Sequence, residues 1–121
     1  MGHPTIYPTG VTVYNPEKCW NGFTIFQALE VGAVLMNMNG RENKVWKGVH
    51  GFPNKIFPGG YLMTSRGSRD GRYGVQDGLD LVQIDWDGNV VWKFDRNEYI
   101  EDPGIPGRWM ARSHHEYQRE G

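Results

Sequence analysis

The segment Leu81-Val-Gln-Ile-Asp-Trp-Asp-Gly-Asn-Val-Val-Trp-Lys-Phe94 alternates polar and apolar residues, turns at an Asp-Gly pair and returns through Val-Trp-Lys. The same pattern occurs in Val34-Leu-Met-Asn-Met-Asn-Gly-Arg-Glu-Asn-Lys-Val-Trp-Lys47, which turns at an Asn-Gly pair. Alternation favours strands, and an Asx-Gly pair favours a primed hairpin turn because both residues tolerate a positive φ. The turn glycines, Gly40 and Gly88, lie 48 positions apart, which is in or near the spacing of propeller blades. The two hairpins therefore predict a repeated β unit.

The composition favours one small β domain. The chain has 121 residues, of which 17 are Gly and 7 are Pro, a level that is normal for short strands and turns. A net charge of −1 gives no argument for a nucleic-acid or membrane partner, and no apolar run is long enough to span a bilayer. Cys19 is the only cysteine, so no disulfide forms within the chain. We expect Cys19 to be a small buried hydrophobe or an unreactive thiol.

Turn and strand signals divide the chain into four segments. Residues 1–22 are expected to be irregular with one short strand at 11–14, residues 23–54 form a first β unit, residues 55–108 form a second, and residues 109–121 begin a further strand. Residues 95–108 are expected to be a loop, and residues 27–30 are the one segment that could form a single helical turn. The chain is therefore predicted to be all-β, with antiparallel hairpin repeats.

The second unit contains a long loop at residues 65–78, and loops of this length are often functional or mobile. Its three arginines, Arg66, Arg69 and Arg72, are interleaved with Ser, Gly and Asp, which favours solvated side chains.

Two β units alone would leave sheet faces and edges open, and about three or more repeats are usually needed to cover them. We therefore expect about two blades of a β-propeller, completed by homo-oligomerisation or by the remaining blades of a larger protein. The alternative is a compact two-sheet domain that closes on itself.

Five elements in a fixed order resemble bacterial arylsulfotransferase-like proteins. They are Gly10-Val-Thr-Val-Tyr-Asn-Pro-Glu-Lys18 with Asn21-Gly-Phe-Thr-Ile-Phe26, Val34-Leu-Met-Asn-Met-Asn-Gly40 with Val45-Trp46, Lys55-Ile-Phe-Pro-Gly-Gly-Tyr-Leu62, Ile84-Asp-Trp-Asp-Gly-Asn-Val-Val-Trp92, and His114-His115-Glu116. The last is similar to a His-His-Asp element of that family, with Glu in place of Asp. The resemblance runs over nearly the whole chain but covers only the N-terminal portion of a full-length member. Asp-Gly-Asn-Val-Val-Trp alone also occurs in quinoprotein-type propellers.

The resemblance implies a six-bladed β-propeller that transfers a sulfuryl group from an aryl sulfate to a phenol through a channel histidine, without a cofactor. The histidine that is sulfurylated in the family lies downstream of the matched region, so this chain would supply anion-binding residues at best. The N-terminus lacks the charged and apolar regions of a signal peptide. The resemblance implies a periplasmic protein if a signal has been removed, and the protein is otherwise expected in the cytoplasm.

Sulfuryl transfer needs a nucleophile and groups that hold three oxygens, roles for which imidazole and guanidinium are suited. The candidates for a catalytic role are His115 and His50, and those for substrate binding are Arg112 and His114. Because neighbouring residues on a strand point in opposite directions, we expect at most one of His114 and His115 to line a channel. The alternative for each is a loop, core or solvated side chain, and His3 is expected to be terminal disorder.

Three consecutive residues on a strand do not converge easily on one ion, so no metal site is predicted at His114-His115-Glu116. Of the tryptophans, Trp46 and Trp92 hold equivalent repeat positions, which favours packing in the core or between blades over ligand stacking. Trp86, at a turn, is expected to be half exposed. A non-catalytic β-propeller scaffold or interaction module is the alternative function.

Overall fold

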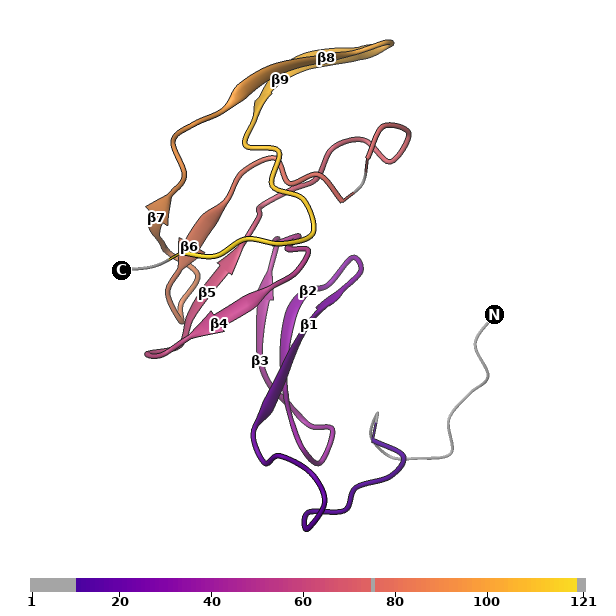
Figure 1. The fold of residues 1–121 in the computed structure, drawn as a ribbon, viewed down its shortest axis with the longest axis vertical. Helices are drawn as coiled ribbons and strands as arrows, with labels where there is room; N and C mark the ends of the chain where they lie inside the picture. The colour runs from indigo at the N-terminus through magenta and orange to yellow at the C-terminus, as the bar shows by residue number, and fades with distance from the viewer. Residues whose placement is uncertain (1–10, 75, 120–121) are drawn as a thin grey trace.

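The computed structural model describes residues 11–74 and 76–119, and the expectation for His3 falls outside them. The fold is all-β and antiparallel, as predicted (Figure 1). Sheet A has the order β1-β2-β3, sheet B has the order β4-β5-β6-β7, and β8 pairs with β9 in a separate hairpin. The strands are β1 Phe23–Ala28, β2 Gly32–Asn37, β3 Glu42–Lys47, β4 Lys55–Phe57, β5 Tyr61–Thr64, β6 Val82–Ile84, β7 Val90–Lys93, β8 Glu98–Asp102 and β9 Ile105–Met110. None of the described residues forms a helix that could cross a membrane.

The β2–β3 and β6–β7 turns are built from the same hydrogen bonds. In the first, the Asn37 side-chain oxygen accepts from the backbone N of Asn39 and of Arg41, each at 3.0 Å. In the second, the Asp85 carboxylate accepts from the backbone N of Asp87 at 2.9 Å and of Asn89 at 2.8 Å. The repeat inferred from the sequence is therefore reproduced at the level of individual bonds.

The turn type differs from the primed turn predicted for the Asx-Gly pairs. Gly40 and Gly88 have φ values of 75° and 93°, whereas Asn39 and Asp87 do not have positive φ. This pattern matches a type I turn followed by a glycine in the left-handed region. The side-chain bonds of Asn37 and Asp85 hold the turn in this form, so only the glycine needs the positive φ.

The hairpin registers also correct one equivalence between the repeats. Each hairpin has a bulge on its return strand, with Leu35 opposite Lys44 in the first and Gln83 opposite Trp92 in the second. At the constant offset of 48, Lys44 corresponds to Trp92, and Trp46 corresponds to Phe94. Trp46 and Trp92 are therefore not equivalent, because the Val-Trp-Lys match in the sequence is shifted by two residues from the structural register.

One hydrophobic core joins the two sheets. Sheet A contributes Ala33, Leu35 and Trp46, and sheet B contributes Leu62, Val82 and Ile84. Trp46 is 3% exposed, and its Nε1 donates to the backbone oxygen of Asp85 at 3.1 Å. The expectation that Trp46 packs between the units is confirmed, and Trp86, which meets the Trp46 ring edge-on, is partly exposed as predicted.

Three local predictions were wrong. Residues 11–14 form no strand, and residues 27–30 lie at the end of β1 and in a turn rather than in a helical turn. Residues 95–108 are not a loop but mostly the β8–β9 hairpin, which turns at Pro103-Gly104. Gly104 has a φ of 77°, as the second central residue of a type II turn requires. Trp109 therefore closes a hairpin opposite Tyr99 instead of opening a new strand.

The C-terminal segment crosses the outer face of sheet B (Figure 1). Lys55, Met63, Gln83 and Trp92 lie side by side in one row across the four strands. Lys55 ion-pairs with Glu116, the Tyr117 hydroxyl lies 3.0 Å from the Met63 carbonyl, and the Arg119 guanidinium lies 4.7 Å above the Trp92 ring. We call residues 116–119 the strap, because they cover this row.

Candidate functional site

The loop at residues 65–78 is attached to the C-terminal segment through Gly78. Gly78 forms antiparallel bridges with both Ser68 and Ser113, and its N donates to the Ser113 carbonyl at 2.7 Å. A Cβ at Gly78 would overlap the Ser113 hydroxyl and lie 3.2 Å from the Asp80 carbonyl. The close approach that only glycine allows places the end of the loop directly beside the histidine pair.

An ion-pair chain runs from the β8–β9 hairpin to His114. Arg69 makes a bidentate contact with Asp102, with Nε 2.8 Å from Oδ2, and its Nη1 lies 3.1 Å from Asp77 Oδ2. The other oxygen of Asp77 lies 2.5 Å from His114 Nδ1. An ionised carboxylate only accepts hydrogen bonds, so Nδ1 carries the proton of this contact and Nε2 is the ring nitrogen that is left available.

These contacts depress the pKa values of both carboxyl groups. The hydrogen bond from Arg69 lowers the pKa of Asp102, although desolvation opposes the shift. Burial alone would raise the pKa of Asp77, but the hydrogen bonds from His114 and Arg69 more than offset it and leave that pKa below the ordinary value. Both carboxylates are therefore ionised at neutral pH, and they raise the pKa of the Arg69 guanidinium.

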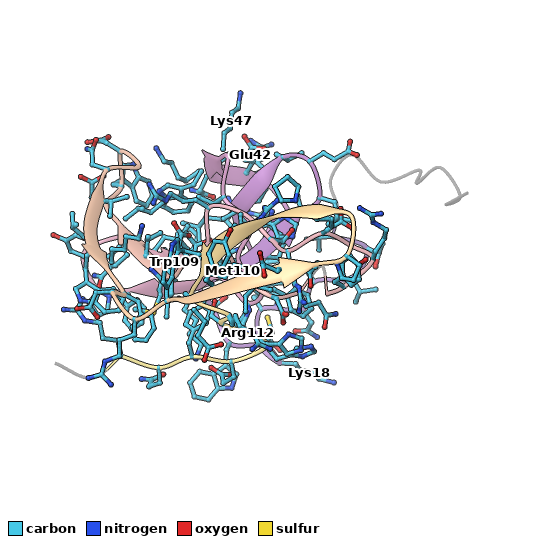
Figure 2. All side chains as sticks on the ribbon, turned by 90° about the horizontal axis from the view of Figure 1, so that it is seen from above. Lys18, Glu42, Lys47, Trp109, Met110 and Arg112 are labelled. Carbon is cyan, nitrogen blue, oxygen red and sulfur yellow. The ribbon has the colours of Figure 1, made fainter. Side chains whose placement is uncertain are left out.

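A pocket of about 520 Å³ opens beside His114, at the base of the β8–β9 hairpin. Three basic side chains line it, those of Arg96, Arg112 and His114, together with the two carboxylates of Asp77 and Glu98. Arg112 pairs with Glu98 at 3.2 Å, and both side chains are exposed. Arg96 has no ion-pair partner among residues 11–74 and 76–119. Figure 2 shows Arg112 beyond Met110 and Trp109, which end β9.

The two histidines point to the same side, which corrects the expectation that they would diverge. Their ring centroids are 4.1 Å apart, and the rings are tilted by 35°. Residues 114 and 115 are not in a strand, and His115 has a φ of 62°, which breaks the alternation of a strand. His115 contacts Gln76 through Nε2 and meets Phe52 edge-on at 5.3 Å, so His114 and not His115 lines the pocket.

His50 lies apart from this pair. It lines a different pocket, of about 290 Å³, together with Arg66, Gln27 and Glu30. Its backbone N donates to the Ser65 carbonyl at 2.6 Å. The structure therefore brings Arg112 and His114 together in one pocket but does not bring His50 to them.

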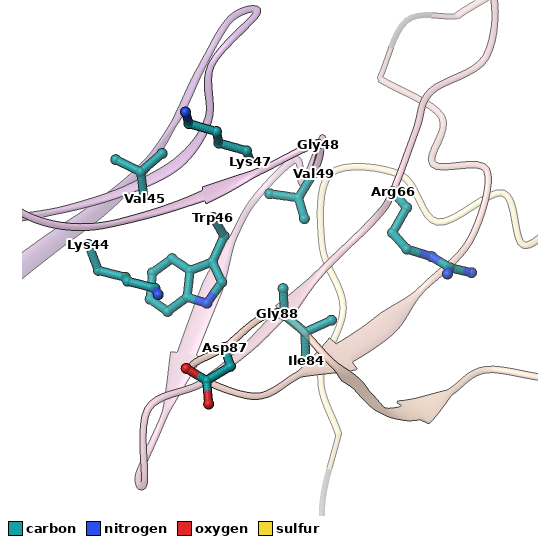
Figure 3. A pocket seen from close by; sticks show the side chains of 10 residues that line it. All are labelled: Lys44, Val45, Trp46, Lys47, Gly48, Val49, Arg66, Ile84, Asp87 and Gly88. Carbon is teal, nitrogen blue, oxygen red and sulfur yellow. The ribbon is translucent and has the colours of Figure 1, made fainter.

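A third cleft, of about 390 Å³, lies between the two sheets (Figure 3). Lys44 extends beside the Trp46 indole, 5.8 Å from the ring centroid, and Arg66 is directed away from both. Arg66 is held by Asp80 at 2.8 Å. None of the four residues proposed from the sequence lines this cleft, so we assign it no role.

Sequence reasoning missed Asp77, Arg69 and Asp102. The three loop arginines were expected to be solvated, and this holds in part for Arg66 and Arg72, which remain about half exposed or more. It was wrong for Arg69, which is largely buried between two carboxylates. The available signal was the alternation of Arg and Asp in a Gly-rich loop, but the partner Asp102 is 33 residues away and gave no local pattern.

We expect acid to detach the loop from the hairpin. Because the folded-state pKa values of Asp77 and Asp102 lie below 3.8, their stabilisation is complete above that value and is lost as the pH falls through the lower, folded-state pKa. NMR signals of residues 69–78 should therefore be unchanged down to about pH 4. Below about pH 4 the chemical shifts of these residues should move towards those of an unattached, flexible chain, while the signals of the sheets stay unchanged.

The Arg69→Met variant is the control for this transition, since it should show the detached loop already at neutral pH. A transition centred near pH 6.5, the ordinary pKa of histidine, would contradict the assignment to the two carboxylates.

No protein-family model matches this chain, and no curated protein or solved structure matches it. The function must therefore be argued from the pocket itself.

Proposed function

We propose that this chain is part of an arylsulfotransferase-like β-propeller and that the pocket lined by Arg96, Arg112 and His114 binds the sulfate group of an aryl sulfate. The observation that carries the proposal is the convergence of these three basic side chains on one pocket. One face of sheet A packs on one face of sheet B in a shared core. This contact supports a propeller arrangement, because neighbouring blades also pack face to face.

The three side chains suit an oxyanion for different reasons. A guanidinium presents several N–H donors in one plane, which matches two oxygens of a sulfate group. Arg96 has no carboxylate partner in the described part of the chain, whereas Arg112 would exchange its exposed bond to Glu98 for one to the ligand. His114 would act through Nε2, because Asp77 occupies Nδ1, and this nitrogen donates to an oxyanion only when the ring is protonated on both nitrogens.

The proposed role is binding and not the complete reaction. In the transfer, the bond between sulfur and the aryl oxygen breaks as a histidine nitrogen bonds to sulfur, and a phenol oxygen then takes the sulfuryl group from nitrogen. Hydrogen-bond donors that are already in place stabilise the charge on the peripheral oxygens during both steps. Arg112, and His114 when its ring carries a proton on both nitrogens, would provide such donors, and the nucleophile would come from other blades.

Sulfate binding tests the proposal. We expect inorganic sulfate and 4-nitrophenyl sulfate to give saturable NMR shifts at Arg96, Arg112 and His114, at matched ionic strength. A hydrogen bond to a charged group contributes about 1.5–3 kcal/mol, so Arg96→Ala and His114→Ala should each weaken binding by about 10-fold or more. His50→Ala is the matched control, because His50 lines another pocket. Non-saturable shifts, or equal losses in His50→Ala and His114→Ala, would refute the site.

A non-catalytic scaffold is the second candidate, and one observation favours it. Two of the three basic side chains already have a carboxylate partner, Glu98 for Arg112 and Asp77 for His114. Under this alternative the two side-chain pairs stabilise the base of the β8–β9 hairpin, and sulfate should not bind in a saturable way. The same titration therefore separates the two functions.

A further inference from the structure

The two sheets meet through unlike faces of the same repeat. We call the side of sheet A that carries Leu35 and Trp46 its forward face, and the side that carries Val34 and Met36 its back face. Residues paired across neighbouring strands share a face, so Phe26 and Val45, which both pair with Val34, also belong to the back face. The forward face of sheet A packs on sheet B and forms the core.

The offset of 48 residues between the two repeats shows which face of sheet B packs on the forward face of sheet A. Val34 and Met36 correspond to Val82 and Ile84, and both of these are buried against sheet A. The contact inside the chain is therefore a forward face on a back face. The forward face of sheet B and the back face of sheet A take no part in this contact.

The two remaining faces differ in how they are covered. The forward face of sheet B includes the row of Met63, Gln83 and Trp92 under the strap, and Met63 is buried by this cover. On the back face of sheet A, Val34 is buried at 8% exposure, whereas Phe26 beside it is 40% exposed. Residues of the segment 11–19 line a small pocket with Thr24 and Met36 of this face.

We infer that the back face of sheet A is a docking surface for the forward face of sheet B of a second copy of this chain. The argument is continuity, because the docked sheets would repeat the contact that Leu35 and Trp46 already make with Val82 and Ile84. Such a contact joins two different surfaces, so it builds a ring or a filament of copies rather than a symmetric pair. The strap lies on the face that must dock and therefore competes with the second copy.

This inference rests on the repeat and not on sulfate binding. Sedimentation equilibrium of the full chain is the test. We expect a mass that rises with concentration, and a stronger association in Tyr117→Ala, which weakens the hold of the strap on Met63. Introduced into the full chain or into Tyr117→Ala, Phe26→Glu should weaken the association by about 10-fold or more, because it places a charge in an apolar contact.

Phe23→Glu is the matched control. Phe23 lies on the same strand but pairs with Asn37, on the side opposite to Phe26, and is 63% exposed. Thermal unfolding of each variant verifies that it is folded. The inference is overturned if the full chain and Tyr117→Ala stay monomeric at every concentration, or if Phe23→Glu and Phe26→Glu weaken association equally. Phe26→Glu should retain sulfate binding, so failure of one proposal can be told from failure of the other.

Discussion

Replacement of Trp46 by alanine is expected to lower the free energy of unfolding by about 3–5 kcal/mol, the range for removal of a buried tryptophan. The indole is 3% exposed and fills the contact between the sheets. Its Nε1 also donates to the Asp85 carbonyl, and its ring meets Trp86 edge-on with centroids 5.3 Å apart. The substitution therefore removes apolar contact, a hydrogen bond and an aromatic pair from the core that the two units share.

Urea unfolding followed by circular dichroism measures this loss. Trp20→Ala is the matched control, because Trp20 is 96% exposed and its removal should change stability by no more than about 0.5 kcal/mol. If Trp46→Ala were as stable as Trp20→Ala, the two units would not share a core, and the pairing of forward and back faces would have no support. A lower cooperativity in Trp46→Ala would instead indicate that the units unfold separately.

The parts of the fold that could be predicted from the sequence are those held by contacts between residues close together in the chain. The β2–β3 and β6–β7 hairpins are local, since Asn37 and Asp85 bond to backbone groups two and four residues away. Their signal is therefore contained in five residues. The register that makes Trp92 and Trp46 non-equivalent left no such signal, because it is set by the opposite strand, where Trp92 pairs with Gln83 and Trp46 pairs with Ala33.

The hairpin from Glu98 to Met110 was missed because its two proline-glycine pairs were interpreted as loop signals. Pro103-Gly104 forms the turn itself, whereas Pro106-Gly107 lies inside β9. Gly107 is needed there because a Cβ would overlap the Tyr99 ring from the opposite strand. Proline is tolerated at the edge of a two-stranded sheet, where its missing N–H breaks no ladder.

The candidate site was found only in part, and the missing part consists of long-range contacts. Arg112 and His114 were named from the sequence, but the Asp77–His114 contact spans 37 residues and the Arg69–Asp102 contact spans 33. Such pairs depend on the fold bringing the 65–78 loop to the hairpin. The bridge at Gly78 and the bond from the Tyr73 hydroxyl to the Pro103 carbonyl at 2.6 Å fix that approach.

Gly32→Ala is expected to destabilise the protein by about 2–6 kcal/mol, because two separate costs add. Gly32 has a φ of 132°, and an L-residue held there costs about 1–3 kcal/mol. A Cβ would also overlap the Trp46 carbonyl oxygen and lie 3.1 Å from the Lys47 Cα, and such overpacking costs about 1–3 kcal/mol more. The displaced strand carries Trp46, so the clash is transmitted to the contact between the sheets.

Two other glycines separate these costs. Gly48 has a φ of 72° with no atom within 4 Å of a Cβ, so Gly48→Ala should cost only the backbone term, about 1–2 kcal/mol. Gly22 has neither a positive φ nor a close neighbour, and Gly22→Ala should stay within about 0.5 kcal/mol of the unchanged protein. Urea unfolding of the three variants should rank Gly32 far above Gly48, and Gly48 above Gly22. Equal losses at Gly32 and Gly48 would mean that β3 moves freely away from β2, contrary to the register of Gly32 with Lys47.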